Sequence, residues 1–326
     1  MKRDLILALE KPIAHTPGNC RQLLHAHRTY NARVLVGFVM RSTPFYLQAK
    51  HWIKNGAIGE VVSIQADELP EVFVTATMFR SDWRRFKHLS GGSLLEKCCH
   101  DIDMMTWLSG GAPIRISSMA GVKTLGPNPS LPTRCSDCRI TAECPYYLPP
   151  EAYDVPGLAN RGDDGILYKF VPDNTSCIYN NGHDTYDHQT VQLEYDNGVL
   201  ATLTLDFSCL GSATGRHLKV VGTDGVIFGK LQDREIRLQN KHSDHIETVK
   251  LHDDGSGHIG AERQHSQSFV KMFTEPDYEP LATLEAGFLS AMLCFAADQS
   301  VGEAKHIDIS HLMDEIQPAN LPDPAP

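Results

Sequence analysis

Two segments of the sequence carry residues that could move protons. Lys11 follows a short apolar run, while Glu96, His100 and Asp103 occur together about ninety positions later. In a helix these last three residues would share one face, because positions three and four apart are neighbours. A carboxylate beside an imidazole orients it and raises its basicity, and an ammonium can stabilise a developing alkoxide. If the fold brings Lys11 to this face, the four side chains could perform acid–base chemistry on an alcohol.

The helical residues also have a simpler interpretation. A Glu/His pair four residues apart is common on an exposed helix face, where it forms an ordinary ion pair of small energy. Glu96 and His100 alone therefore leave both interpretations open, and the elements around them must be considered.

The beginning of the chain predicts a strand–helix–strand unit. Residues 5–9 are continuously apolar, which is typical of a buried parallel strand, and Pro12 ends the run. Pro17 can occupy the first turn of a helix, and residues 34–39 form a second buried strand. Lys11 would then lie at the carboxyl end of the first strand, an edge where ligands bind in open α/β sheets.

The rest of the chain predicts helices around an antiparallel sheet. Residues 188–195 and 199–207 alternate polar and apolar residues on either side of an Asp-Asn-Gly turn, which indicates a hairpin. Further strands are expected at 61–66, 217–222, 226–230, 235–238 and 246–251, and helices at 45–55, about 261–273 and 284–300.

Composition limits the classes of function. With 326 residues, 41% of them hydrophobic, the chain can bury a full core and is expected to form about two domains. A net charge of −10 argues against nucleic-acid binding and favours a small-molecule substrate. No apolar run is long enough for a membrane span or a signal peptide, so a cytoplasmic protein is expected.

Several motifs resemble the glucose-fructose oxidoreductase and inositol dehydrogenase family, Gfo/Idh/MocA. Residues 10–12 match its Glu-Lys-Pro signature, and residues 91–103 resemble its Gly-rich lead into Asp-x-Gly-x-His-x-x-Asp. Here Glu96 replaces Asp and Cys98 replaces Gly. The resemblance continues at residues 79–84, 195–198, 222–225 and 284–287, and it covers nearly the whole chain.

The resemblance implies an NAD- or NADP-dependent oxidoreductase acting on a secondary alcohol of a sugar or cyclitol. Lys11 would lie near the nicotinamide and the substrate hydroxyl, His100 would be the base, and Glu96 would take the place of the family's Asp. The residues expected beside the cofactor are Glu10, Lys11, Pro12 and Arg41. The residues expected beside the substrate are Asp103, Arg80, Trp83, Arg84 and His258.

The expected fold is α/β plus α+β. Residues 1–41 are interpreted as a truncated Rossmann-like remnant, because the G-x-G-x-x-G turn that binds pyrophosphate should precede Lys11. Residues 42–312 are expected to form a domain with a large, mainly antiparallel, open-faced sheet flanked by helices. The chain is expected to form a homo-oligomer through this sheet. Residues 313–326 are expected to be a disordered tail.

Two other functions remain open at this point. A chain without the pyrophosphate-binding turn could be a non-catalytic sugar-binding or assembly subunit. The same Lys and His could alternatively serve nicotinamide-assisted glycoside cleavage.

A G-x-G-x-x-G match does occur at residues 255–260. The strand expected before it alternates polar and apolar residues, unlike a buried parallel strand, which argues against a dinucleotide site. The segment instead resembles the family's Gly-His-Gly-Gly substrate loop, with His258 near the sugar. A flexible Gly-rich connection before a helix is an equally good interpretation.

The nine cysteines suggest reduced thiols or metal ligands more than a disulfide framework. Cys135, Cys138 and Cys144 are closely spaced, and with Cys177 they could form a structural zinc site. Reduced cysteines packed as small apolar side chains are the alternative. The adjacent Cys98 and Cys99 are expected to pack in the core.

Overall fold

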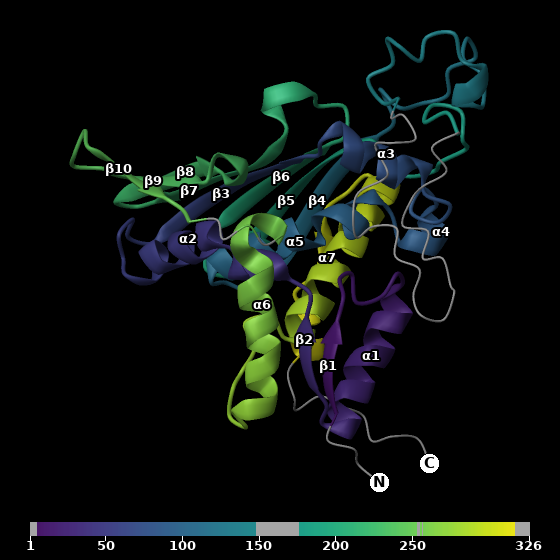
Figure 1. The fold of residues 1–326 in the computed structure, drawn as a ribbon. Coiled ribbons are helices and arrows are strands. Elements are labelled where there is room, and N and C mark those ends of the chain that lie inside the picture. Colours follow the sequence, from purple (N-terminus) through teal and green to yellow (C-terminus); the bar gives the residue numbers. More distant parts are fainter. Residues whose placement is uncertain (1–4, 148–175, 253–254, 256, 317–326) are drawn as a thin grey trace.

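The structure, a computed structural model, describes residues 5–147, 176–252, 255 and 257–316. It contains a two-stranded parallel sheet, β1–β2, and a nine-stranded sheet of order β10-β9-β8-β7-β3-β6-β5-β4-β11 (Figure 1). The expected large, mainly antiparallel sheet is confirmed: β3 and β6 form its parallel pair, and the remaining neighbours are antiparallel.

The strands of the large sheet are β3 (Val61–Leu69), β4 (Pro113–Gly121), β5 (His188–Tyr195), β6 (Leu200–Asp206), β7 (Gly215–Gly222), β8 (Gly225–Lys230), β9 (Glu235–Asn240), β10 (Ile246–Lys250) and β11 (Ile307–Asp308). The helices near it are α2 (Pro44–Lys54), α3 (Val72–Arg80), α4 (Lys87–Ser90), α5 (Ser93–Ser109), α6 (Gly257–Thr274), α7 (Leu284–Glu303) and α8 (His311–Ile316). Each strand and helix predicted in this region has its counterpart, with ends shifted by a few residues.

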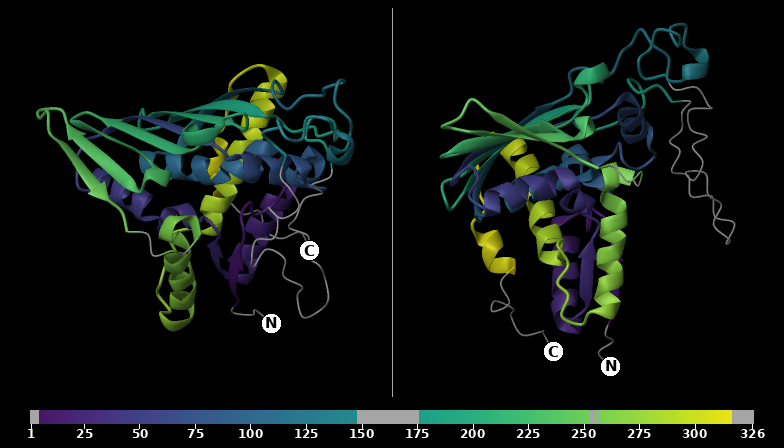
Figure 2. Two further views of the ribbon diagram at one scale, coloured as in Figure 1. Left: turned by 45° about the horizontal axis from the view of Figure 1, so that its top comes forward. Right: turned by 60° about the vertical axis from the view of Figure 1, so that its left-hand side comes forward.

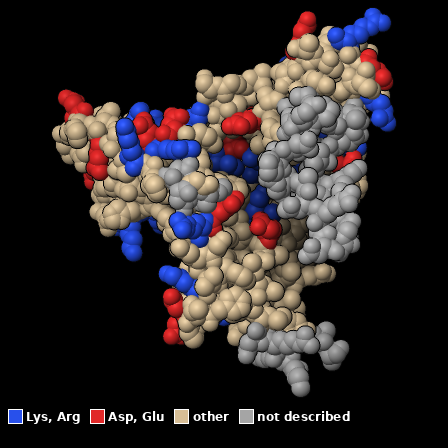
Figure 3. Space-filling model, viewed as in Figure 1, with Lys and Arg blue, Asp and Glu red and all other residues tan. Residues whose placement is uncertain are grey.

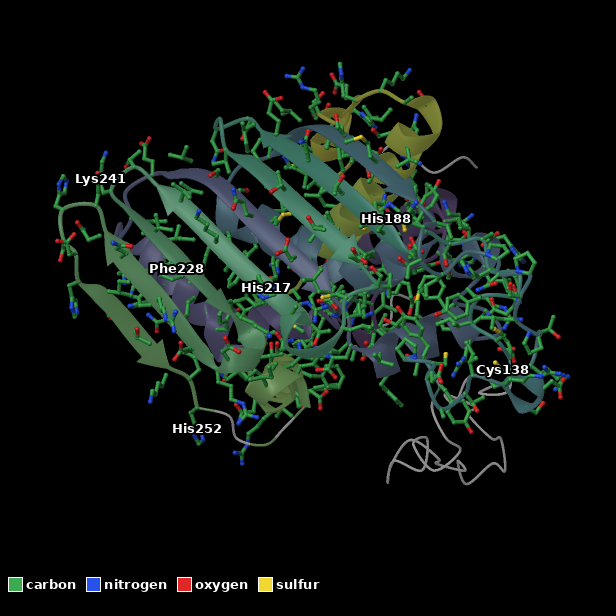
Figure 4. The ribbon with its side chains drawn as sticks, turned by 90° about the horizontal axis from the view of Figure 1, so that it is seen from above. Cys138, His188, His217, Phe228, Lys241 and His252 are labelled. Atoms are coloured by element: carbon green, nitrogen blue, oxygen red, sulfur yellow. The ribbon has the colours of Figure 1, made fainter. Side chains whose placement is uncertain are left out.

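Helices cover one face of the large sheet. In two orientations α5 and α7 run beneath the strands, while no α-helix of the described residues lies over the opposite face (Figures 1 and 2). Figure 4 looks directly onto that open face. The core forms between the sheet and its helices, where Leu205, Ile227 and Phe288 are fully buried.

The beginning of the chain forms the predicted strand–helix–strand unit of β1 (Ile6–Leu9), α1 (Pro17–Tyr30) and β2 (Arg33–Val36), followed by a short 3-10 helix, η1 (Val39–Ser42). The prediction that the first strand is buried was wrong, because no described element covers Leu7, which is 44% exposed. The two strands pair in parallel, with Ile6 opposite Arg33. Thr16 caps α1 by accepting a hydrogen bond from the backbone of Asn19. This unit packs through α1 against α7, which positions the residues after β1 close to the helical layer.

Two features differ from the prediction. The segment of α3 is rich in β-branched and aromatic residues, so its local sequence did not predict a helix. Residues 313–316, expected in a disordered tail, instead complete α8, where Arg21 pairs with Glu315 at 2.7 Å. Residues 317–326 lie outside the described part of the chain. Among the helices that the structure describes, none combines the length and apolar character needed to cross a bilayer.

Candidate active site

Helix α5 carries the candidate catalytic residues through the interior. It follows two glycines with positive φ, and a side chain on Gly91 would meet Leu95 at 2.4 Å. Its middle is anchored by Ser290 of α7, which donates a hydrogen bond to the Cys99 carbonyl at 2.6 Å. Cys98 and Cys99 are buried, as predicted. The carboxylates of α5, Glu96, Asp101 and Asp103, are also buried and must find partners inside the molecule.

Lys11 reaches α5 from the end of β1. Its Nζ donates a hydrogen bond to the Glu96 carbonyl at 2.9 Å, although the two residues are 85 positions apart. The structure thus brings the amine of the opening unit to the helix that holds Glu96 and His100. Figure 3, in the view of Figure 1, shows Lys and Arg atoms together with Asp and Glu atoms in a hollow in the middle of the molecule.

His100 is almost completely buried, and its ring centroid lies 5.6 Å from that of Phe38. Its Nδ1 has no hydrogen-bond partner among the described residues. Burial holds the pKa of His100 well below its usual value, and the charges of Lys11, Arg216, His258 and Lys97 lower it further. The imidazole is therefore neutral at pH 7 and able to accept a proton.

The predicted pairing of Glu96 with His100 is not what the structure shows. Glu96 Oε1 instead pairs with Arg84 Nε at 2.9 Å, and Arg84 also stacks on the Trp83 ring at 4.9 Å. We expected a neighbouring carboxylate to raise the basicity of His100. This prediction was wrong, because burial and the nearby cations both lower the pKa of the imidazole. Burial raises the pKa of the Glu96 carboxyl despite the opposing charges of Lys11 and Arg84.

A second group of buried charges lies against α5 and was not recognised in the sequence. Arg216 of β7 lies 2.9 Å from both Glu68 of β3 and Asp101 of α5, and Lys97 also pairs with Glu68 at 3.0 Å. Burial raises the pKa of Asp101 to about 6 despite Arg216. The available signal in the sequence was that apolar residues lie on most sides of α5, because such a helix is buried and its charged residues then lie in the core.

Other predicted site residues are held by different contacts. Asp103, expected beside the substrate, forms a two-pronged pair with Arg41, expected beside the cofactor, at 2.7 and 2.8 Å. This pair ties η1 to α5. Glu10 lies against Gly37, where an added Cβ would approach its Oε2 to 2.7 Å. Pro12 follows Lys11 through a cis peptide bond.

His258 lies at the irregular beginning of α6. His258, Ile259 and Gly260 have positive φ, and His258 Nδ1 pairs with Glu262 at 2.9 Å. The charge of His258 contributes to lowering the pKa of His100, so the loop faces the same region. The strand before it, β10, is an antiparallel edge strand, which agrees with our rejection of a dinucleotide site. Ser256 of this motif lies outside the described residues.

Arg80 lies with the cysteines. Its side chain is fully buried and its Nη2 is 3.7 Å from Cys135 Sγ. The cysteine loop lies at the opposite end of the molecule from Lys241 (Figure 4). One small cavity is lined by Arg80 together with Cys135, Cys138, Cys144 and Cys177. Within the described ranges, no three His, Cys, Asp or Glu side chains are placed to hold a metal ion, so the predicted zinc site is not supported.

Comparison with protein families gives a clear assignment. Residues 50–309 match the model of the Gfo/Idh/MocA oxidoreductase family, C-terminal alpha/beta domain. The chain belongs to this family. It is similar to YteT of Bacillus subtilis (strain 168), with 26% identity over 93% of the chain and 75% of YteT. It is also similar to levoglucosan dehydrogenase of Pseudarthrobacter phenanthrenivorans, with 33% identity over 31% of this chain and 26% of that enzyme.

Solved structures share the fold. Levoglucosan dehydrogenase in complex with NADH and levoglucosan matches 92% of the chain and 72% of its own length, with a TM-score of 0.66 and 17% identity. A super-repressor mutant of Gal80p from Saccharomyces cerevisiae matches 94% and 73%, with a TM-score of 0.65 and 15% identity. The chain therefore spans about three quarters of the length of YteT and of these two structures.

Proposed function

We propose that this chain takes part in NAD(P)-dependent oxidation or reduction of a secondary alcohol of a sugar or cyclitol. The observation that carries the proposal is the 2.9 Å hydrogen bond from Lys11 Nζ to the Glu96 carbonyl. It joins the amine of the opening unit to the helix of His100. Family membership and the NADH-bound structure of levoglucosan dehydrogenase add support.

The side chains present fit a nicotinamide and an alcohol. An ammonium has three N–H donors, and one of those of Lys11 is used by the Glu96 carbonyl. A substrate hydroxyl could accept from another. Glu10, Lys11 and Pro12 would border the cofactor. When bound, nicotinamide supplies the acceptor or donor of hydride.

The protein's part of the reaction is proton transfer and positioning. His100 is neutral, so it can take the hydroxyl proton as the alcohol becomes a carbonyl. Lys11 would hold the alcohol oxygen and stabilise its developing negative charge. Arg84 keeps Glu96 in place, and Glu96 would act through its backbone carbonyl on Lys11.

The test combines cofactor binding with turnover. NADH is titrated while energy transfer from tryptophan is followed, and a panel of sugars and cyclitols is then assayed for NAD(P)H formation. His100→Ala should reduce turnover by about 10²–10⁴-fold with folding intact. His51→Ala, a change on α2, serves as the matched control. Undiminished turnover in His100→Ala would reject His100 as the base.

A second candidate is a non-catalytic binding subunit. The likeness to a Gal80p super-repressor favours considering it, since one fold can host unrelated functions. No NADH binding up to millimolar concentration would favour this candidate over the enzyme.

We also propose that the chain forms a homo-oligomer through the open face of the large sheet. Met119, Leu200 and Val62 expose large apolar side chains in its strands, and such surfaces commonly mark interfaces. Light scattering of the purified chain and of Met119→Lys tests this: a monomer in both cases would reject it.

A further inference from the structure

The charged groups that contact the middle of α5 include more cations than carboxylates. The cations are Lys11, Arg84, Lys97 and Arg216, and the carboxylates are Glu68, Glu96 and Asp101. Among these described residues there are four cations and three carboxylates. The surroundings of His100 are therefore cationic.

This field acts on His100 from four elements of the fold. Lys11 comes from the end of β1, Arg216 from β7, His258 from the start of α6, and Lys97 from α5 itself. All four charges disfavour the protonated imidazole. Accepting a proton during alcohol oxidation would thus be unfavourable unless a negative group enters the site with the substrate.

Lys97 is the cation best placed to bind such a group. It precedes His100 by three residues, so the two side chains are neighbours on the helix surface. Its partner Glu68 is shared with Arg216, and about a fifth of the Lys97 side chain (21%) stays exposed. An ammonium has three donors, so it can bind a second carboxylate while it keeps Glu68.

Two buried polar atoms without hydrogen-bond partners also point to a ligand beside His100. Within the described part of the chain, His100 Nδ1 and Glu96 Oε2 are buried without hydrogen-bond partners. Buried polar atoms are nearly always satisfied, so orphaned ones call for an explanation. A ligand that offers hydroxyl groups and a carboxylate would satisfy both the orphaned atoms and the excess charge.

We propose that the substrate is an acidic sugar, a uronic or aldonic acid, whose carboxylate binds Lys97. This inference rests on the proposed function and adds the substrate class to it. The carboxylate enters with the alcohol that His100 deprotonates, and its charge offsets the cations around the imidazole. A neutral sugar leaves that field uncompensated.

Equilibrium binding without cofactor tests the inference separately from turnover. Isothermal titration calorimetry compares three matched pairs: D-galacturonate with D-galactose, D-glucuronate with D-glucose, and D-gluconate with D-glucitol. At least one acid should bind about tenfold or more tightly than its neutral partner, as expected for a charge-assisted contact. Equal binding within every pair, or no binding of any acid, would overturn the inference.

Variants assign the preference to one side chain. Lys97→Met should reduce the acid preference to within about twofold and leave neutral-sugar binding unchanged, whereas Lys97→Arg should keep the preference. Lys241→Met, at the far end of the large sheet (Figure 4), is the matched control. An unchanged preference in folded Lys97→Met would overturn the assignment.

A last experiment asks whether Lys97 binds the carboxylate of the substrate or the pyrophosphate of the cofactor. Inorganic pyrophosphate is titrated into the same variants. If pyrophosphate binds through Lys97 while no acid is preferred, the cation serves the cofactor and the inference fails. The NADH titration and the His100→Ala assay remain valid in that case, so the proposed function is judged independently.

Discussion

The two sheets of this molecule differ in how well their apolar surface is covered. In the large sheet the inward side chains are sealed under α5 and α7, as for Leu205 of β6. In β1 of the small sheet Leu7 is 44% exposed, and nearby Phe273 of α6 is 60% exposed. Parallel strands are normally covered on both faces. Strand β1 is therefore less well covered than the large sheet, although Val34, Leu35 and Val36 of β2 are buried in the core that the two sheets share.

This difference matters because the candidate site draws on both regions. His100, Glu96 and Lys97 belong to the helix under the large sheet, but Lys11 comes from the end of β1. A change that loosens the small sheet should remove Lys11 from the site while α5 remains in place. Three predictions test this contrast.

The largest effect is expected in the buried charges beneath the large sheet. Arg216→Leu leaves Glu68 and Asp101 buried side by side without their shared cation, since the Arg216 side chain is only 9% exposed. Breaking a buried pair in this way should lower the free energy of unfolding by about 3–5 kcal/mol. Urea denaturation at pH 7 measures the change.

The matched control for Arg216→Leu is Arg115→Leu. Arg115 pairs with Glu194 at 2.7 Å, but the two side chains are 48% and 35% exposed to solvent. Its loss should lower the free energy of unfolding by about 1 kcal/mol or less. Similar losses in the two variants would contradict the distinction between buried and exposed charges.

Some contacts of the large sheet can be predicted from the sequence, and others cannot. The hairpin of β5 and β6 could be predicted because Asp-Asn-Gly and two-residue alternation are local signals. The parallel pairing of β3 with β6 and the contact of Arg216 with Asp101, 115 positions apart, depend on the path of the whole chain. No local pattern encodes them.

In the candidate site, too, the sequence predicts one part, the identity of the residues, and not the other, their electrostatics. The motif residues Lys11 and His100 were identified by resemblance, but their electrostatics were not. A helical spacing predicts that Glu96 and His100 are neighbours, and it cannot predict that Arg84 takes the carboxylate. Partners from other elements decide the charge state of a buried group.

A second, smaller effect compares one leucine from each sheet. Leu205→Ala removes a fully buried side chain and should lower the free energy of unfolding by about 2–5 kcal/mol. Leu7→Ala removes a half-exposed one and should lower it by less than about 1 kcal/mol, because less apolar surface is lost. Thermal or urea unfolding measures both. A larger loss for Leu7→Ala would mean that β1 has cover that the described residues do not supply.

The smallest effect concerns one of the contacts between the opening unit and the helices of the large sheet. His27 of α1 lies 3.3 Å from Glu285 of α7, and a hydrogen bond from His27 is the main cause that lowers the pKa of Glu285 from 4.5 to about 2. A carboxyl with a lowered folded-state pKa stabilises the fold above its unfolded pKa. This contribution is fully present above about pH 4.5 and is lost as the pH falls through 2.

Glu285→Gln should therefore lower the free energy of unfolding at pH 7 by about 1 kcal/mol, a value reduced for the partial exposure of the pair. It should also remove this part of the stability lost between pH 4.5 and 2. Hydrogen exchange at pH 7 should accelerate in α1 and β1 while the large sheet keeps its protection, since local opening follows the weaker contacts. Glu194→Gln, on the large sheet, is the control and should leave α1 unchanged. If exchange in Glu285→Gln instead rose equally in both sheets, the small sheet would not be a separately opening unit, and Lys11 would be held as firmly as His100.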